Sequence, residues 1–221
     1  MPERAQELAS LFPDHVVVET GVPGQIEGEL FEQEAACVER AIEKRREEFA
    51  AGRLLSRRAL GRLGFAPGPL LPAEDRSPIW PEGIAGTITH TRNFCAVAVA
   101  PHSQSLCLGL DIEDGSPLKD ELAERICTPR ELEWLAANAS TDAQRGRLGK
   151  LVFSAKEAFY KCQYPLTKRF LEFEDVELKL DLEAQTFEAI VRPDKNDLPP
   201  DIRLTSRFLY LDEFVICAVS G

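Results

Sequence analysis

Residues 153–161 read FSAKEAFYK, and this stretch decides how the C-terminal half of the chain is organised because it forms two turns of a predicted helix. At 3.6 residues per turn, Glu157 and Lys161 share one face, and Lys156 and Tyr160 share the neighbouring face. A Glu and a Lys one turn apart are usually a solvent-exposed pair that stabilises the helix slightly. Here two lysines and a carboxylate lie among aromatic residues, which also predicts a charged site.

A second charged stretch, GLDIE at residues 109–113, ends a predicted strand. The period of two along a strand puts Asp111 and Glu113 on one face and Ile112 on the other. Carboxylate oxygens are the hard ligands that Mg²⁺ prefers in proteins. Although a single DxE pattern is common by chance, the two stretches together predict a magnesium site formed by Asp111, Glu113 and Glu157, with cations beside it.

The composition excludes several classes of protein. With a net charge of −11, the chain is not a general binder of nucleic acid or of anionic membranes, so any anionic ligand needs a local cluster of Arg and Lys. No apolar run approaches the roughly 20 residues that span a bilayer, and no apolar signal core follows the N-terminus. The six cysteines form no CxxC pair. We therefore expect a cytoplasmic protein with reduced thiols and no integral membrane segment.

The N-terminal half alternates strand, helix and strand patterns. We predict a strand at residues 15–19, the longest helix at 32–63, and a hairpin of strands at 87–90 and 94–100. Gly52 is a candidate break in the helix, and Gly64 fits its C-terminal cap. Five prolines make residues 66–85 an irregular ordered loop.

The C-terminal half repeats this order. We predict a strand at 106–113, helices at 117–126, 129–138 and 144–164, and an antiparallel meander of strands at 176–182, 186–191, 202–210 and 214–219. Thr128 is the expected N-cap of the second helix, and Pro165 is expected to end the third. The pattern predicts an α+β fold of two similar half-domains, 1–104 and 105–221, each a long helix packed on an antiparallel sheet.

Basic residues are spread over both halves. Arg53 and Arg57 are one turn apart on the same face, which suits the clamping of a phosphate but also fits a solvated basic face. Arg76 lies in the proline-rich loop, and His90, as a lone histidine, also fits a structural residue. With Lys156 and Lys161, these residues could bind a polyanionic phosphate ester. The chain has no P-loop, GxSxG or GxGxxG motif.

Four motifs, in one order, resemble those of the Sfp/EntD-type 4′-phosphopantetheinyl transferases, the group of enterobactin synthetase component D. GLDIE followed by FSAKEAFYK is similar to the paired signatures of that family, and RLLSR at residues 53–57 resembles its GRxxAR segment. RSPIWPEG at 76–83 and GTITHT at 86–91 resemble its WPxGxxGSxSH segment. Thr87 and Thr89 replace the usual serines but keep a hydroxyl for phosphate contact. The match covers roughly residues 45–165.

The resemblance implies a monomeric pseudo-dimer of two α+β halves with the active site in the cleft between them. It implies transfer of the 4′-phosphopantetheine arm of coenzyme A to a serine of an apo carrier protein, with release of 3′,5′-ADP. The N-terminal half would bind the nucleotide of coenzyme A, and the C-terminal half would hold the metal and the catalytic residues. The implied roles are metal ligation by Asp111, Glu113 and Glu157, catalysis by Glu157 (the base, directly or through water), Asp111, Lys156 and Lys161, and coenzyme A binding by Arg53, Arg57, Arg76, Thr89, His90, Lys156 and Lys161.

Two alternatives stay open at this point. A Mg²⁺-dependent nucleotide phosphohydrolase would use the same acidic and basic residues, and a non-catalytic carrier-protein binding module would keep the fold but lose the carboxylates. The sequence does not decide between peptidyl, aryl and acyl carriers or between peptide synthetase and polyketide assembly. FSAKEAFYK reads closest to the enterobactin-type branch, which favours siderophore assembly.

Overall fold

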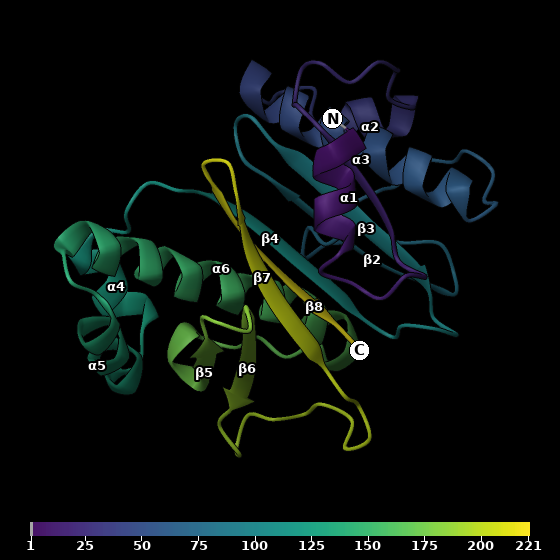
Figure 1. Cartoon of the computed structure of the whole chain (residues 1–221). Helices are drawn as coiled ribbons and strands as arrows, with labels where there is room; N and C mark the ends of the chain where they lie inside the picture. Colours follow the sequence, from purple (N-terminus) through teal and green to yellow (C-terminus); the bar gives the residue numbers. More distant parts are fainter. Residues whose placement is uncertain (1) are drawn as a thin grey trace. The chain divides into compact units, whose positions relative to one another are not determined.

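The computed structural model, which describes residues 2–221, divides into two compact units, one ending at Leu108 and the other beginning at Gly109. Each unit has one long helix packed on an antiparallel sheet, α3 in the first and α6 in the second (Figure 1). The predicted α+β fold is therefore confirmed. The division of roles between halves 1–104 and 105–221 stays a prediction.

In the first unit, α3 packs on a three-stranded sheet of order β1-β3-β2. Ala51, Leu55 and Ala59 follow one another at a spacing of four, so they form one buried stripe on α3, which contacts Val97 and Val99 of β3. The predicted hairpin is confirmed as β2 and β3, which pair antiparallel. The elements of this unit are α1 (Pro2–Ala9), β1 (Val17–Gly21), α2 (Glu32–Cys37), α3 (Glu43–Arg62), β2 (Ile84–His90) and β3 (Cys95–Pro101).

The single long helix predicted at 32–63 is wrong in one respect. The chain forms two helices, and the break lies at residues 38–42 rather than at Gly52. Gly52 is buried inside α3, where a Cβ would lie 3.0 Å from the Cγ2 of Ile88, so this glycine lets β2 approach the helix. The predicted cap at Gly64 agrees with the structure. Its φ is +85°, and the Gly64 and Phe65 N–H groups donate to the last turn of α3.

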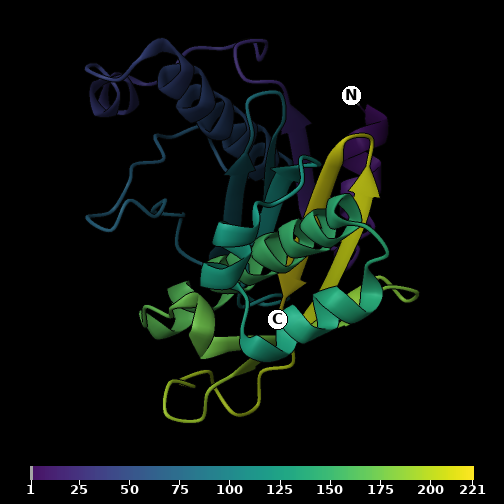
Figure 2. The same ribbon diagram turned by 90° about the vertical axis from the view of Figure 1, so that its left-hand side faces the viewer.

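In the second unit, α6 packs on the sheet beside β8, as the view in Figure 2 shows. The sheet has the order β4-β8-β7-β6-β5, so the predicted meander of β5 to β8 is confirmed, and β4 lies next to β8. The elements are β4 (Leu108–Asp114), α4 (Asp120–Ile126), α5 (Pro129–Asn138), α6 (Asp142–Thr167), the short 3₁₀ helix η1 (Phe173–Asp175), β5 (Val176–Asp181), β6 (Thr186–Val191), β7 (Thr205–Leu211) and β8 (Phe214–Ser220).

The helix ends in this unit test two predictions. Thr128 is the N-cap of α5, because its Oγ1 accepts from the Glu131 N–H at 3.3 Å, as predicted. The prediction that Pro165 ends the long helix is wrong, because α6 continues through it to Thr167. A proline removes one N–H donor, and α6 ends within a turn, at Lys168 with a φ of 53°.

Among the residues that the structure describes, no helix is long and apolar enough to cross a bilayer. The same residues contain six free cysteines, of which all but Cys37 are buried. The expected free, mostly buried thiols therefore agree with the structure.

We predict that Gly109→Ala destabilises the protein by about 3 kcal/mol or more, because a Cβ at this position of β4 would overlap the carbonyl of Ala158 in α6. The matched control is Gly61→Ala in α3, where nothing lies within 4 Å of the new Cβ. This control should gain up to about 1 kcal/mol, because alanine is the better helix former. Urea unfolding measures both. Equal midpoints for Gly109→Ala and the unchanged protein would contradict the close contact.

Candidate functional site

A line of charged residues on α6 faces the carboxylates of β4. Lys150, Glu157 and Lys161 are seven and four residues apart, so they share one side of the helix. The Lys161 ammonium donates to Asp111 Oδ1 at 2.6 Å, and the Lys150 ammonium donates to Glu113 Oε2 at 3.2 Å. Each carboxylate of the DxE pattern therefore has its own lysine from α6. Lys150 was not predicted, although its spacing from Glu157 could have identified it.

The three predicted carboxylates influence one another electrostatically. Burial raises the pKa of Glu113, and the Asp111 charge raises it further, against the opposing effect of Lys150. Burial also raises the pKa of Glu157, where Lys161 opposes the rise and Asp111 adds to it. Because the charge of Asp111 raises the pKa of both other carboxylates, the three groups are close enough to repel one another.

The residues that the structure describes contain no group of three or more His, Cys, Asp and Glu arranged to hold a metal ion. Asp111 and Glu113 are instead paired with lysines, which offset part of the repulsion among the carboxylates. The donor set still fits Mg²⁺, because it consists of hard carboxylate oxygens whose charges oppose one another and would be stabilised by a divalent cation.

Lys156, which the sequence predicts at the phosphates of coenzyme A, has partners inside the protein in this structure. Its ammonium is buried and donates to three groups of the protein: Glu131 Oε2 at 2.7 Å, and the carbonyl oxygens of Ile126 and Phe173, both at 2.8 Å. The reason is its place on α6, four residues after the buried Val152. Lys156 therefore joins α6 to α4, α5 and η1, and all three of its donors are used.

A pocket of about 170 Å³ lies beside Glu157. One wall is α6, where Tyr160 stacks on Tyr164 at a centroid distance of 5.3 Å. The other wall is formed by residues 170–173, and Phe170 meets the Tyr160 ring edge-on at 5.8 Å. Larger hollows exist, such as one of about 760 Å³ between α1 and β1, but its lining contains none of the predicted site residues.

In the first unit, Arg53 is a buried cation. Only 7% of its surface is exposed, and its guanidinium lies over the Phe49 ring, 4.1 Å from the centroid. Among the described residues, no group accepts a hydrogen bond from its Nε–H. Burial lowers the pKa of Arg53. A buried guanidinium held mainly by a ring is suited to receive an anion.

His90 lies next to the same helix. Its Nε2 is 3.3 Å from an Arg45 guanidinium nitrogen, and its Nδ1 is 3.7 Å from Glu48 Oε2. The Arg45 charge also lowers the pKa of Arg53. Arg45 and His90 both pair with Glu48, and no contact joins either of them to Arg53 among the contacts described. The sequence reasoning missed Arg45, although it lies about two helical turns before Arg53.

The other predicted ligands of coenzyme A are placed differently. Arg57 differs from the prediction, because its guanidinium donates to the buried Glu34 at 2.7 Å and to the Glu29 carbonyl at 3.0 Å. The cause is Glu34 of α2, which lies against α3 once the long helix is broken. Arg76 is exposed in its loop with a φ of 67°. Thr89 is buried and, by strand alternation, lies on the opposite face of β2 from His90.

Comparisons with known proteins identify the family of this chain. Residues 33–100 match the 4′-phosphopantetheinyl transferase N-terminal domain, and residues 107–216 match the 4′-phosphopantetheinyl transferase superfamily. The chain is 43% identical over 187 residues to 4′-phosphopantetheinyl transferase Svp of Streptomyces mobaraensis, covering 82% of this chain and 75% of the relative. It is 33% identical over 224 residues to 4′-phosphopantetheinyl transferase Npt of Nocardia iowensis, covering 92% and 99%. Enterobactin synthase component D of Escherichia coli K12 is 34% identical over 128 residues, covering 57% and 58%.

This chain therefore belongs to the 4′-phosphopantetheinyl transferase superfamily. It is an enzyme that transfers phosphopantetheine from coenzyme A to carrier proteins. The predicted family and the transfer of phosphopantetheine to carrier proteins are confirmed, which favours the transferase over the phosphohydrolase and over the non-catalytic module.

We predict that the two lysines of FSAKEAFYK differ in their effect on stability. Lys156→Ala should cost about 3–5 kcal/mol, because it leaves Glu131 buried without its ionic partner. Lys161→Ala should cost less, about 1–3 kcal/mol, because the Lys161 side chain is 29% exposed although its partner Asp111 is buried. Guanidinium unfolding measures both. Similar losses of stability would contradict the internal role of Lys156.

Proposed function

We propose that this transferase splits coenzyme A at its pyrophosphate and passes phosphopantetheine to a serine hydroxyl of an apo carrier protein, releasing 3′,5′-ADP. The observation that carries this proposal is that Asp111 and Glu113 of β4 pair with lysines of α6, the helix that also carries Glu157, and that Glu157 lines a pocket. In the reaction, a bond forms between the serine oxygen and the phosphorus of phosphopantetheine. The bond from that phosphorus to the bridging oxygen breaks, and this oxygen leaves with 3′,5′-ADP.

The acidic residues would hold the metal. Asp111, Glu113 and Glu157 are the residues that would bind Mg²⁺, which when bound neutralises charge on the pyrophosphate. Lys161 contacts Asp111 and is partly exposed, so it can also offer its charge to a phosphate. Lys156 has all its donors engaged inside the protein, and we assign it no phosphate contact.

Glu157 is the proposed base. Serine is a poor nucleophile at neutral pH and needs a group that accepts its proton. Burial raises the pKa of Glu157, which brings the carboxylate closer to the range in which general bases work well. Its place at the pocket lets it meet a serine that approaches the end of the phosphopantetheine arm.

The pocket beside Glu157 would hold the pantetheine arm. This arm is an uncharged chain of amides and methylene groups, so it suits a small pocket that has aromatic and aliphatic side chains among a few charged ones. Tyr160 and Phe170 stand at an angle to each other across the two walls. The polar Glu157 and the peptide groups of residues 170–173 give the amides of the arm possible partners.

The first unit would bind the nucleotide. Arg53 and Arg45 supply the positive charge, His90 and Glu48 lie beside Arg45, and the buried Arg53 is the proposed ligand of the 3′-phosphate. Arg57 is engaged by Glu34, so we leave it out of this set. Arg76 and Thr89 stay predictions from the sequence, as does a single active site shared by both halves.

The carriers served are proposed from the relatives. Enterobactin synthase component D supports siderophore assembly, and therefore peptidyl or aryl carriers. We propose that the enzyme acts on them as a monomer. Incubation with coenzyme A, Mg²⁺ and peptidyl, aryl or acyl carriers, followed by mass spectrometry, ranks the three by their rate of gaining phosphopantetheine. Preferential loading of the acyl carrier would contradict siderophore assembly.

We predict that Glu157→Gln lowers carrier loading by about 10² or more, because the amide is neither a base nor an anionic ligand. Asp111→Ala and Glu113→Ala should abolish loading, and EDTA should do the same to the unchanged enzyme. Without metal, the melting temperature of Glu157→Gln should hold or rise, because burial and Asp111 both disfavour the ionised carboxylate. Near-normal loading by Glu157→Gln, or full activity in EDTA, would contradict the assigned roles.

We predict that Arg53→Ala weakens coenzyme A binding by about 1.5–3 kcal/mol, the range for a charge-assisted hydrogen bond. Binding of 3′-dephospho-coenzyme A should change much less, because it lacks the group that Arg53 would contact. Arg57→Ala is the matched control from the same helix face, and it should not discriminate between the two ligands, because Arg57 is bound to Glu34. Calorimetry with both ligands is the measurement. Equal losses in Arg53→Ala would exclude a contact with the 3′-phosphate.

A further inference from the structure

The outer wall of the pocket beside Glu157 is an irregular segment. Residues 168–172 connect the end of α6 to the short helix η1, and residues 170–173 line the pocket. Phe170 is 64% exposed, so burial of its own ring does little to fix it. The opposite wall is the long helix α6. The contacts that hold residues 170–173 against α6 therefore determine the width of the pocket.

The start of this segment is held at Arg169. The buried Gln163 of α6 donates its Nε2–H to the Arg169 carbonyl at 3.0 Å. The Arg169 guanidinium in turn donates to Asp197 Oδ2 at 2.6 Å and to the Asp194 carbonyl at 3.1 Å. Asp194 and Asp197 lie in the connection between β6 and β7, far from the pocket in sequence.

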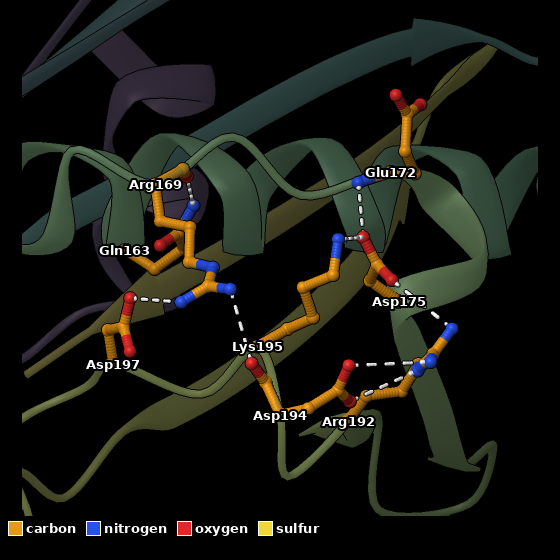
Figure 3. A network of polar contacts seen from close by, with 8 residues as sticks. All are labelled: Gln163, Arg169, Glu172, Asp175, Arg192, Asp194, Lys195 and Asp197. Atoms are coloured by element: carbon orange, nitrogen blue, oxygen red, sulfur yellow. Dashed lines mark hydrogen bonds and ion pairs between the residues drawn. The ribbon is translucent and has the colours of Figure 1, made fainter.

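The end of the segment is held at Asp175, whose side chain is 3% exposed. Its Oδ2 accepts from the Glu172 N–H at 3.0 Å and lies 3.5 Å from the Lys195 ammonium. Its Oδ1 lies 3.6 Å from an Arg192 guanidinium nitrogen. Figure 3 shows Asp175 between these two cations and Arg169 bound to the acidic residues of the same connection.

The connection between β6 and β7 thus binds both ends of the segment that forms the pocket wall. Residues 192–197, which we name the brace, use two cations at Asp175 and two acidic residues at Arg169. Arg192 also pairs with Asp194 at 3.4 Å, which links the residues that bind Asp175 to those that bind Arg169. An isolated exposed ion pair contributes little, but a network that includes a buried carboxylate holds its groups in one geometry.

We propose that the brace positions the wall of residues 170–173 and thereby determines how tightly the enzyme binds the pantetheine arm of coenzyme A. This inference rests on the proposed function, in which that arm occupies the pocket beside Glu157. None of residues 192–197 lines the pocket, and the ion pairs and hydrogen bonds at Arg169 and Asp175 connect them to its wall. They are positioning residues, and their effect is confined to ligands that carry the arm.

The test compares two ligands in the same variants. Coenzyme A has the pantetheine arm, and 3′,5′-ADP has only the nucleotide. Arg169→Gln and Asp197→Asn should each weaken coenzyme A binding about twofold to thirtyfold, the range for a mutation along a coupling network, and leave 3′,5′-ADP binding unchanged. Isothermal calorimetry measures both affinities. Asp175→Asn should act in the same direction, and the partly exposed Arg169 keeps the test possible if this buried variant fails to fold.

The matched control is Glu188→Gln, which removes the exposed pair with Lys179 at 3.6 Å on β5 and β6 and leaves the ion pairs of Asp175 and Arg169 intact. It should leave both affinities unchanged. A brace variant that loses affinity for both ligands equally, or for neither, would overturn the inference.

Phe170→Ala separates this inference from the function on which it rests. The variant removes the wall directly, so it should weaken coenzyme A binding without affecting 3′,5′-ADP. If Phe170→Ala has this effect and the brace variants do not, the brace inference fails alone. If Phe170→Ala also leaves coenzyme A binding unchanged, the assignment of the arm to this pocket fails, and the brace inference fails with it.

Discussion

The second unit depends on the close approach of β4 to α6. At Gly109 the strand lies so near the carbonyl of Ala158 that only a residue without a Cβ fits. Two residues later along β4, Asp111 reaches Lys161, which also donates to the Leu110 carbonyl at 3.2 Å. A glycine at the start of GLDIE therefore brings the strand carboxylates to the helix that carries Glu157. The two motifs are one structural feature, although they are far apart in the chain.

Local patterns were sufficient for much of the fold. Thr128 followed by Pro129 marked the start of α5, and alternation of β-branched residues marked the β2–β3 hairpin. The same reasoning placed Asp111 and Glu113 on one strand face. The wrong predictions concern positions where contacts between distant parts of the chain override local sequence preferences. Gly52 looked like a helix break but is a contact point for Ile88, because periodicity cannot show that a strand approaches there.

The site was predicted less completely than the fold for the same reason. Spacing along one helix shows which residues share a face, but it does not show what the next element brings to that face. Glu34 of α2 takes Arg57, so Arg45 rather than Arg57 lies with His90. Which residues of α2, α3 and β2 come into contact depends on how these three elements pack. A local sequence pattern within one element cannot show this.

The lysines of FSAKEAFYK show how burial separates two residues that a motif treats alike. Lys156 has a 2% exposed side chain and three fixed acceptors, so its charge is compensated inside the protein. Lys161, one and a half turns later, is partly exposed and has one carboxylate partner. Moving Lys156 toward a ligand would leave Glu131 as an unpaired buried anion, a cost of several kcal/mol. Lys161 can reach solvent, but its partner Asp111 is buried, so moving Lys161 away from it would also have a cost. The same residue type is therefore enclosed in the protein at one position and lies at its surface at the other.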